Sequence, residues 1–336
     1  MLTVYLDQNK WIDLARAESG HPQGVRFVET LAVLKAAADD GRARFPLSMA
    51  HYYETGKQRD RRKREELTAT MTRLAGMLRI APPHVIVPWE IKRALIDSFG
   101  LGIPVEKLDL FGFGAAHAAA SPSLRYVAPA EYRGVPLPAD VRQELQRRVE
   151  PEYERVILAG ATPDGMPDDR RIILNDMKNV TDDRFVDGQR NVAEVLKSIG
   201  RRRLSDVMVA TAIADIIDPL LRISGQLGVE FNDIVDRMTH LIEAMPSRWV
   251  EMRLRQARQA NPQKEWSGND LNDVTALAIA VPYCDIVVTE KSWAAMLTDA
   301  KIPARFDHRV IASLDDLVNF LEAIPRPQSP KQNVEE

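Results

Sequence analysis

The chain has 336 residues, with 45 basic and 48 acidic side chains, a formal net charge of −3 and one cysteine. Its apolar fraction of 45% and charged fraction of 28% are those of a folded globular protein, and they exclude a disordered or collagen-like chain. The balanced charge excludes a uniformly basic nucleic-acid binder, and the lone Cys284 excludes an internal disulfide and a cysteine-rich zinc site.

The N-terminal segment predicts a strand followed by two helices. Residues 2–6 form a short apolar run that ends abruptly at Asp7, which is typical of a buried strand. Apolar residues then recur at helical spacing from Asn9 onward and again over residues 25–38.

The next segment continues the alternation of strands and helices. We expect a second strand over residues 44–47 and then a long helix that begins after Ser48, a good N-cap, and reaches about Met77. Beyond the Pro-Pro break that follows, the pattern predicts a third strand over residues 85–87 and a helix over 89–98.

The middle of the chain differs in character from its two ends. Residues 100–137 are rich in Gly, Pro and Ala, which indicates a boundary or a long functional loop. Residues 139–252 predict helices almost throughout. Strands are expected again over 285–289 and 309–311, each linked to a helix.

These patterns predict an α/β protein with a parallel sheet flanked by helices. We expect its main domain to combine residues 1–98 with residues 265–324. A large, mostly helical insertion would occupy residues 99–264, and the polar, proline-rich residues 325–336 would form a mobile tail.

Acidic side chains are predicted at one edge of this sheet. Asp7 ends the first strand, Glu54 lies one or two turns into the helix after the second, and Glu290 follows the strand over 285–289. Asp270 and Asp273 open the helix that leads back into that strand. Because the carboxyl ends of parallel strands share an edge, we expect these acids to converge there.

Converging carboxylates repel one another, so a cation is expected among them. Mg²⁺ or Mn²⁺ fits best, because hard cations prefer carboxylate oxygen and no Cys or His cluster offers a zinc site. Such a centre is suited to activating water for phosphodiester cleavage. Asp285 is discounted, because it precedes its strand and lies on the order of 13 Å from the other acids, at about 3.3 Å per residue.

Three segments of the chain resemble a PIN-domain nuclease, and the resemblance covers about residues 1–98 and 265–320. The similar segments are Val4-Tyr-Leu-Asp-Gln-Asn-Lys-Trp-Ile-Asp-Leu14, Pro46-Leu-Ser-Met-Ala-His-Tyr-Tyr-Glu54 and the block over residues 269–291. The resemblance implies a parallel sheet flanked by helices and metal-dependent endoribonuclease activity.

The resemblance also implies roles for individual acids. Asp7, Glu54 and Asp273 match the first, second and third acids of the family, with Asp270 as an outer ligand or a competitor. The family's threonine-aspartate pair appears here as Thr289-Glu290. Glutamate is one methylene longer, so Glu290 would ligate through water, or another residue would supply the fourth acid.

Each of these residues also has a purely structural interpretation. Asp7 can be a turn or helix cap, and Glu54 a solvated helix residue. Asp270 and Asp273 can be helix N-terminal charges that the macrodipole favours. Asn9 and Thr289 are candidates for hydrogen bonding to the acids, with capping as the alternative.

Two basic clusters are candidates for binding phosphate. The first is expected on the Glu54 helix and contains Lys57, Arg59, Arg61, Arg62 and Arg64. The second is Arg201-Arg202-Arg203, at the start of a helix in the insertion. Such contacts position a nucleic-acid strand without reading its sequence. A solvated helix face and surface ion pairs are the alternatives.

The sequence therefore predicts a metal-dependent endoribonuclease in which Asp7, Glu54, Asp273 and Glu290 are catalytic. A PIN-like module that binds nucleic acid or protein without cutting, and a nuclease for DNA or branched DNA, are the alternatives. No nucleotide-binding fingerprint and no Ser-His or Cys-His pairing occurs.

The sequence also leads to expectations about the cellular location and the binding partners of the protein. The N-terminus has no export signal and no uncharged run of 18 apolar residues occurs, so we expect a cytoplasmic protein without membrane contact. RNA is the expected partner. The insertion would clamp this substrate, bind an inhibitor protein or hold a second copy of the chain.

Overall fold

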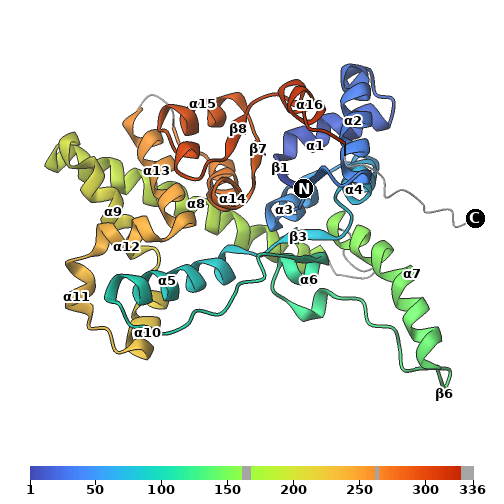
Figure 1. Cartoon of the computed structure of the whole chain (residues 1–336), viewed down its shortest axis with the longest axis horizontal. Helices are drawn as coiled ribbons and strands as arrows, with labels where there is room; N and C mark the ends of the chain where they lie inside the picture. Colours follow the sequence, from blue (N-terminus) through green and yellow to red (C-terminus); the bar gives the residue numbers. More distant parts are fainter. Residues whose placement is uncertain (161–167, 262–264, 327–336) are drawn as a thin grey trace, which may run out of the picture.

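The computed structural model describes residues 1–160, 168–261 and 265–326, and for residues 168–180 it describes the backbone alone. Four parallel strands form the main sheet in the order β2-β1-β7-β8. They are β1 (Leu2–Leu6), β2 (Ala43–Arg44), β7 (Ile286–Val288) and β8 (Arg309–Ile311). Segments from the two ends of the chain thus lie side by side, which confirms a parallel sheet in an α/β protein (Figure 1).

The two faces of this sheet are buried in different cores. Val4, Leu6 and Val288 lie in one core, and the alternate residues Tyr5 and Val287 lie in another, as the two-residue repeat of a strand requires. The first core is shared with α1 (Gln8–Glu18), α2 (Val28–Asp39) and α16 (Leu314–Glu322). The second is shared with α14 (Gly268–Tyr283) and α15 (Lys291–Asp299). Burial on both faces explains why the two central strands are continuously apolar over residues 4–6 and 286–288.

The long helix expected after Ser48 is broken in two. The first part is α3 (Met49–Lys57) and the second is α4 (Arg61–Ala75). Gln58 is extended, with ψ of 118°, and Asp60 then accepts hydrogen bonds from the backbone N–H groups of Arg62 and Lys63. A new N-cap inside the expected helix therefore restarts it in another direction.

The prediction of a strand over residues 85–87 is wrong. These residues belong to α5 (Pro83–Phe99), and the strand in this region is β3 (Leu78–Ile80), which pairs antiparallel with β4 (Phe111–Phe113). Pro83 is in the first turn of α5, where the fixed φ of proline suits a helix and its missing N–H has no intrahelical partner to lose. The proline pair therefore starts a helix rather than a strand.

The Gly-Pro-rich segment is mostly loop, with short elements within it. These are α6 (Gly114–Ala118), the 3-10 helix η2 (Pro122–Leu124) and a hairpin of β5 (Glu131–Tyr132) and β6 (Val135–Pro136). The hairpin and the start of α7 (Ala139–Leu158) extend away from the body of the molecule (Figure 1). Two further 3-10 helices are η1 (Pro22–Phe27) and η4 (Pro303–Arg305).

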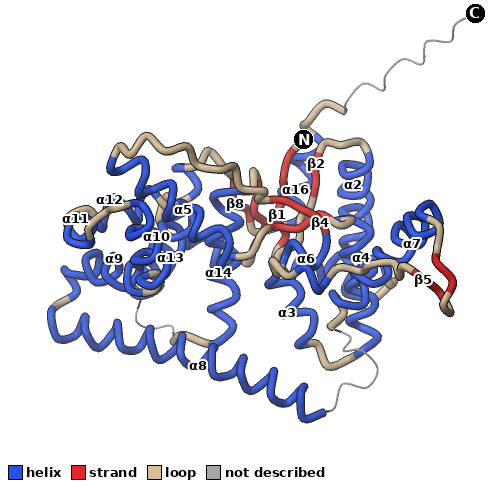
Figure 2. The backbone as a smooth tube through the Cα atoms, turned by 90° about the horizontal axis from the view of Figure 1, so that it is seen from below, coloured by secondary structure: helices blue, strands red, loops and turns tan. Residues whose placement is uncertain are grey.

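Helices make up the described residues from α7 to α13, as the sequence predicts. They continue with α8 (Asp168–Ile199), η3 (Arg201–Arg203), α9 (Leu204–Ala214), α10 (Ile217–Leu227), α11 (Phe231–Val235), α12 (Met238–Ala244) and α13 (Pro246–Ala260). Helices α5, α8, α9, α10, α12 and α13 share a third core. The backbone of α8 runs along this core and on past α14 (Figure 2).

The helical region is packed directly against the sheet region. Val250 and Leu254 of α13 lie in the same core as Val287 of β7, and α13 packs along α14. The division into a discontinuous domain and an insertion stays a prediction. Of the expected tail, residues 327–336 lie outside the described residues. Among the described helices, none combines the length and apolar character needed to cross a bilayer.

Candidate functional site

The register of the sheet brings Asp7 to Thr289. Leu6 is paired with Val288 across the parallel strands, and the backbone N–H of Asp7 donates to the carbonyl of Val288 over 2.9 Å. Thr289 Oγ1 then donates to Asp7 Oδ2 over 2.9 Å. Asp7 Oδ1 accepts from the backbone N–H of Gln8 over 2.7 Å, so Asp7 also caps α1. Asp7 therefore both caps α1 and lies at the carboxyl end of β1.

A buried histidine fixes α3 against the end of β1. His51 Nε2 lies 2.9 Å from the carbonyl oxygen of Leu6, which can only accept, so Nε2 carries the proton and donates. Its Nδ1 accepts from the backbone N–H of Ser48 over 2.9 Å. Burial lowers the pKa of His51 to about 4, which keeps the ring neutral. Glu54 lies one helical turn further along α3 and is thereby carried to the end of β1.

The two aspartates of α14 have different surroundings. Asp270 forms a capping box with Ser267, and its Oδ2 accepts from Ser267 N over 2.7 Å and from Ser267 Oγ over 2.9 Å. The same oxygen accepts from Nη2 of the buried Arg258 over 2.7 Å. Asp270 was expected as an outer ligand; its charge is instead paired, so we leave it out of the candidate ligand set. Asp273, one turn further on, lines a pocket that Asp270 does not line.

This pocket has a volume of about 280 Å³ and is formed where α1, α3, α14 and the start of α15 meet. Glu54, Asp273 and Glu290 line it, with Lys57 on one side and the amides of Gln8, Asn9, Asn269 and Asn272 around it. Asp7 is not part of this lining, but its charge acts on both Glu54 and Asp273. The structure therefore groups Asp7, Glu54, Asp273 and Glu290.

Burial and mutual repulsion change how these acids titrate. Burial, followed by the charges of Asp7 and Asp273, raises the pKa of Glu54 to about 8. Burial and then the charge of Asp7 raise the pKa of Asp273 to about 7. Burial also raises the pKa of Asp7, although hydrogen bonds from Thr289 and Gln8 act in the opposite direction. Raised pKa values at several acids that interact are typical of functional sites.

Hydrogen-bond donors orient two of the acids and leave one without a partner. Asn9 Nδ2 donates to Glu290 Oε1, and Trp293 Nε1 donates to Asp273 Oδ2 over 3.0 Å. In the described part of the chain, no hydrogen bond or ion pair is recorded for the carboxylate of Glu54. Gln8 Oε1 is likewise buried without a hydrogen-bond partner there. Both oxygen groups belong to residues that line the pocket.

The donor set suits a hard divalent cation. It consists of the carboxylates of Glu54, Asp273 and Glu290 with side-chain amides around them. Among the described residues, no three Asp, Glu, His or Cys side chains already form a tight metal-binding group.

The basic residues are divided between two regions. Lys57 ends α3 and lines the pocket. Beyond the break, Arg61 and Arg62 pair with Glu65 and Glu66 over 2.8 Å each, and Arg64 donates to the backbone carbonyls of residues 58 and 59. The cluster is therefore not on the Glu54 helix as expected, apart from Lys57. Arg59 is exposed in the connection between the helices.

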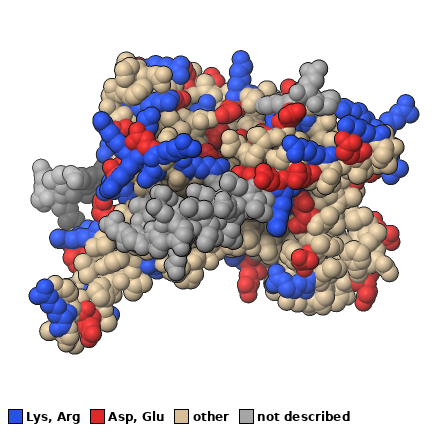
Figure 3. Space-filling view, turned by 180° about the vertical axis from the view of Figure 1, so that it is seen from behind, with Lys and Arg blue, Asp and Glu red and all other residues tan. Residues whose placement is uncertain are grey.

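The second basic cluster lies far from the pocket. Arg201, Arg202 and Arg203 form η3, which packs against α8 and α9 at the opposite end of the long axis from α4 (Figures 1 and 2). Arg203 pairs with Asp206. On the rear face, Lys and Arg side chains gather in a band, with Asp and Glu side chains beside it (Figure 3). A role of either cluster in binding nucleic acid stays a prediction.

Several residues of the site have no clear signal in the sequence. Trp293 resembles any apolar helix residue, and Gln8, Asn269 and Asn272 resemble residues that flank helix starts. Comparison with protein-family models, curated proteins and solved structures found no match to this chain. The resemblance to PIN-domain nucleases therefore remains a prediction based on the residues described above.

Proposed function

We propose that the chain is a metal-dependent endonuclease of PIN-like fold that hydrolyses phosphodiester bonds, with RNA as the expected substrate. The observation that carries the proposal is the grouping of Asp7, Glu54 and Asp273 from three separate elements: Glu54 and Asp273 line one pocket, and the charge of Asp7 raises the pKa of both. Burying several repelling acids costs free energy that the fold would gain back by binding a cation.

Two further features support a PIN-like nuclease in particular. The acids lie where the carboxyl edge of a parallel sheet meets the starts of its helices, the position at which α/β proteins bind ligands. Lys57 lines the same pocket and supplies a positive charge for a phosphate of the substrate.

In the proposed centre, Asp7, Glu54, Asp273 and Glu290 would hold Mg²⁺ or Mn²⁺. When bound, the cation supplies Lewis-acid activation of water and neutralises charge on the phosphate under attack. Trp293 and Asn9 hold Asp273 and Glu290 in fixed orientations by donating hydrogen bonds to them. Gln8 Nε2 donates to Thr55 Oγ1 over 3.1 Å, so this side chain links the start of α1 to α3 beside the proposed centre.

The test is cleavage of labelled single-stranded RNA, and of DNA of the same sequence, by purified protein with Mn²⁺. We expect internal cuts in RNA that leave 5′-phosphate ends, and loss of about 10²-fold or more in rate for Asp7→Asn, Glu54→Gln and Asp273→Asn. Asp285→Asn is the matched control, because Asp285 accepts from Thr3 N at the opposite end of the sheet, over 2.6 Å.

Each other outcome has a defined meaning. Cleavage of DNA alone would replace RNA by DNA as the substrate. Cleavage that survives Asp7→Asn and Asp273→Asn would show that the activity comes from elsewhere. Protein that binds RNA but neither cuts it nor binds Mn²⁺ would reject the nuclease proposal in favour of a binding module.

A further inference from the structure

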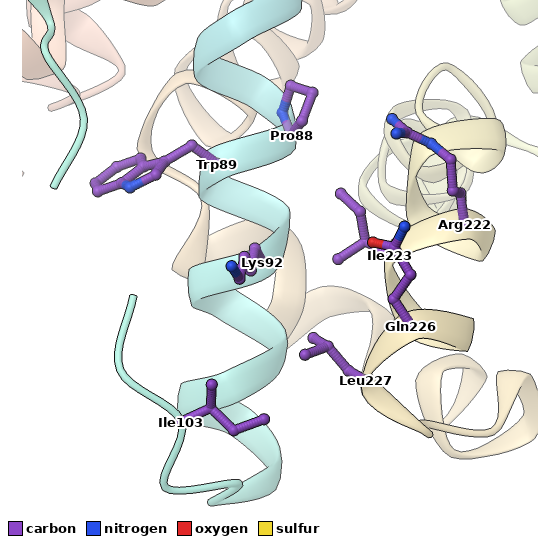
Figure 4. Close-up of a pocket in the computed structure, with 8 residues that line it drawn as sticks. All are labelled: Pro88, Trp89, Lys92, Ile103, Arg222, Ile223, Gln226 and Leu227. Carbon is purple, nitrogen blue, oxygen red and sulfur yellow. The ribbon is translucent and has the colours of Figure 1, made fainter. Parts of the chain in front are cut away.

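A groove lies between α5 and α10, outside the acidic pocket. It has a volume of about 450 Å³, within the range of small-molecule sites. Trp89 and Lys92 contribute from α5, Ile223 and Leu227 point from α10 toward α5, and Ile103 closes one end from the loop that follows α5 (Figure 4). Segments that are distant in the sequence thus form one concave surface.

The loop wall of this groove is fixed by a hydrogen bond. The indole Nε1 of Trp89 donates to the backbone carbonyl of Glu106 over 2.8 Å, which ties the loop to α5. Ile223 and Leu227 point into the space between α5 and α10, and with Ile103 at one end they give the groove its apolar lining, whereas the Trp89 ring lies on the other side of α5 (Figure 4). Such a lining favours an aliphatic or aromatic body over a fully polar ligand.

Two cations in the groove have no partner among the residues that the structure describes. In the described part of the chain, no hydrogen bond or ion pair is recorded for Lys92 or for Arg222, and no Asp or Glu lines the groove. Arg93 on the same helix is different, because it pairs with Asp97 over 3.8 Å. The groove therefore combines an apolar lining with two uncompensated positive charges, which complement an anion.

We propose that this groove binds a small amphipathic organic anion, with its acidic head attracted by Lys92 and Arg222 and its apolar body along Ile103, Ile223 and Leu227. The head is a carboxylate, sulfonate or phosphate. Two cations in a lining without Asp or Glu select for negative charge, and the apolar lining selects against inorganic phosphate alone. The proposal is independent of the nuclease activity, since none of these residues lines the acidic pocket.

The experiment uses the full chain and the fluorescent anion anilinonaphthalene sulfonate as the probe. Wild-type protein is expected to bind one probe per chain, and dodecanoate is expected to displace it. Lys92→Ala/Arg222→Ala should weaken binding about tenfold and reduce its salt dependence. Gln226→Trp keeps both cations but fills the groove, so it should abolish probe binding. Lys107→Ala/Arg202→Ala removes the same charge elsewhere and should bind as wild type does.

Competition with unlabelled ligands shows which kind of anion the groove binds and whether it binds nucleic acid instead. Displacement by dodecanoate identifies an acyl carboxylate, and displacement by adenosine monophosphate identifies a nucleotide; either result supports the proposal. Displacement only by a single-stranded oligonucleotide would overturn it and make the groove a nucleic-acid contact. Unchanged probe binding in both Lys92→Ala/Arg222→Ala and Gln226→Trp would also overturn it, provided that circular dichroism shows both variants folded.

Discussion

Trp293 and Asp273 come from the two helices that flank β7 in the sequence, and the indole Nε1 of Trp293 donates to Asp273 Oδ2 over 3.0 Å. The guanidinium of Arg258 lies 5.5 Å from the centre of the same indole ring, and its Nη2 donates to Asp270 over 2.7 Å. The ring is therefore held by a cation–π contact while its N–H orients the carboxylate. An arginine of α13 thus supports an acid of the candidate site through a tryptophan.

Trp293→Phe is expected to weaken cation binding at neutral pH. Phenylalanine keeps an aromatic ring near Arg258 but removes the donor that lowers the pKa of Asp273, so this pKa should rise further above about 7. Since the cation binds the ionised acid, affinity for Mn²⁺ should fall about 3- to 10-fold at pH 7 and recover at higher pH.

Titration of Mn²⁺ by calorimetry between pH 6.5 and 8.5 measures this effect. Trp266→Phe is the matched control. The centre of the Trp266 ring lies 4.9 Å from the Arg258 guanidinium, and its indole donates no hydrogen bond to an acid among the described residues. Equal affinities of the two variants at every pH would contradict the orienting role of Trp293.

Glu54→Gln is expected to stabilise the protein at alkaline pH. The pKa of Glu54 is about 8 in the folded chain and about 4.5 when unfolded, so between these values the folded state binds more protons. Its contribution to stability therefore falls as pH rises from about 4.5 to 8. Removing the carboxylate should raise the melting temperature at pH 8.5 by about 2–4 °C and leave it nearly unchanged at pH 4.5.

Differential scanning calorimetry across this pH range, without divalent cations, checks the prediction. Glu322→Gln removes an exposed acid at the end of α16 and serves as the control. Glu54 and Asp273 repel each other, so their titrations are coupled. The double variant should therefore gain less stability than the sum of the gains of the two single variants. A loss of stability in Glu54→Gln at pH 8.5 would show that its carboxylate is not under repulsion.

Divalent cations are expected to raise the melting temperature, and more so at pH 8 than at pH 6. A cation that binds only the folded chain adds about 2.7 kcal/mol at a hundred times its Kd. Protons compete for Glu54 and Asp273, whose pKa values are about 8 and 7, so the gain should shrink as pH falls. EDTA should reverse it. An equal gain in Asp7→Asn, Glu54→Gln and wild type would locate the cation elsewhere.

Glu154→Gln is expected to destabilise the chain strongly. Glu154 Oε1 accepts from Nη2 of the fully buried Arg79 over 2.7 Å, and its Oε2 accepts from the backbone N–H of Ala115 over 2.7 Å. Tyr52, two residues before Glu54, also donates to Oε1. Leaving Arg79 buried without a counter-charge should cost about 3–5 kcal/mol.

Urea denaturation measures this cost against Glu152→Gln. Glu152 lies on the same helix and pairs with Arg155 at the surface, so its loss should cost at most about 1 kcal/mol. The double variant Arg79→Met/Glu154→Met should be more stable than Glu154→Gln, because neither charge is then left alone. Equal effects of Glu154→Gln and Glu152→Gln would show that the buried Arg79–Glu154 pair does not hold α7 to β3.

Lys57→Ala should weaken RNA binding, whereas Arg202→Ala should not. Lys57 lines the acidic pocket, and Arg202 is in η3 at the other end of the molecule. Loss of one phosphate contact should reduce affinity about 3- to 10-fold and lower the slope of log affinity against log salt by about one. Fluorescence anisotropy in the Asp7→Asn background separates binding from cutting. The reverse ranking would move the RNA to the helical end.

Local patterns were sufficient to predict most elements that contribute to the site. The apolar run over residues 2–6 ends at Asp7, and that strand occurs with the same bounds, because burial on both faces leaves a continuous apolar signal. The same kind of signal was misleading over residues 85–87. Three adjacent apolar residues fit a buried strand and a helix equally well, and only the packing of Ile86 within α5 decides between them.

The sequence by itself determined the sheet, the helical middle and the acids available at the ends of strands, because each follows from residues within a turn or a strand of one another. Only the tertiary structure decided which acids face a common pocket. Asp270 and Asp273 are equivalent by spacing, yet Asp270 is neutralised by Arg258 from α13 while Asp273 remains in the pocket. Charge pairing of this kind depends on contacts between elements, which local periodicity does not encode.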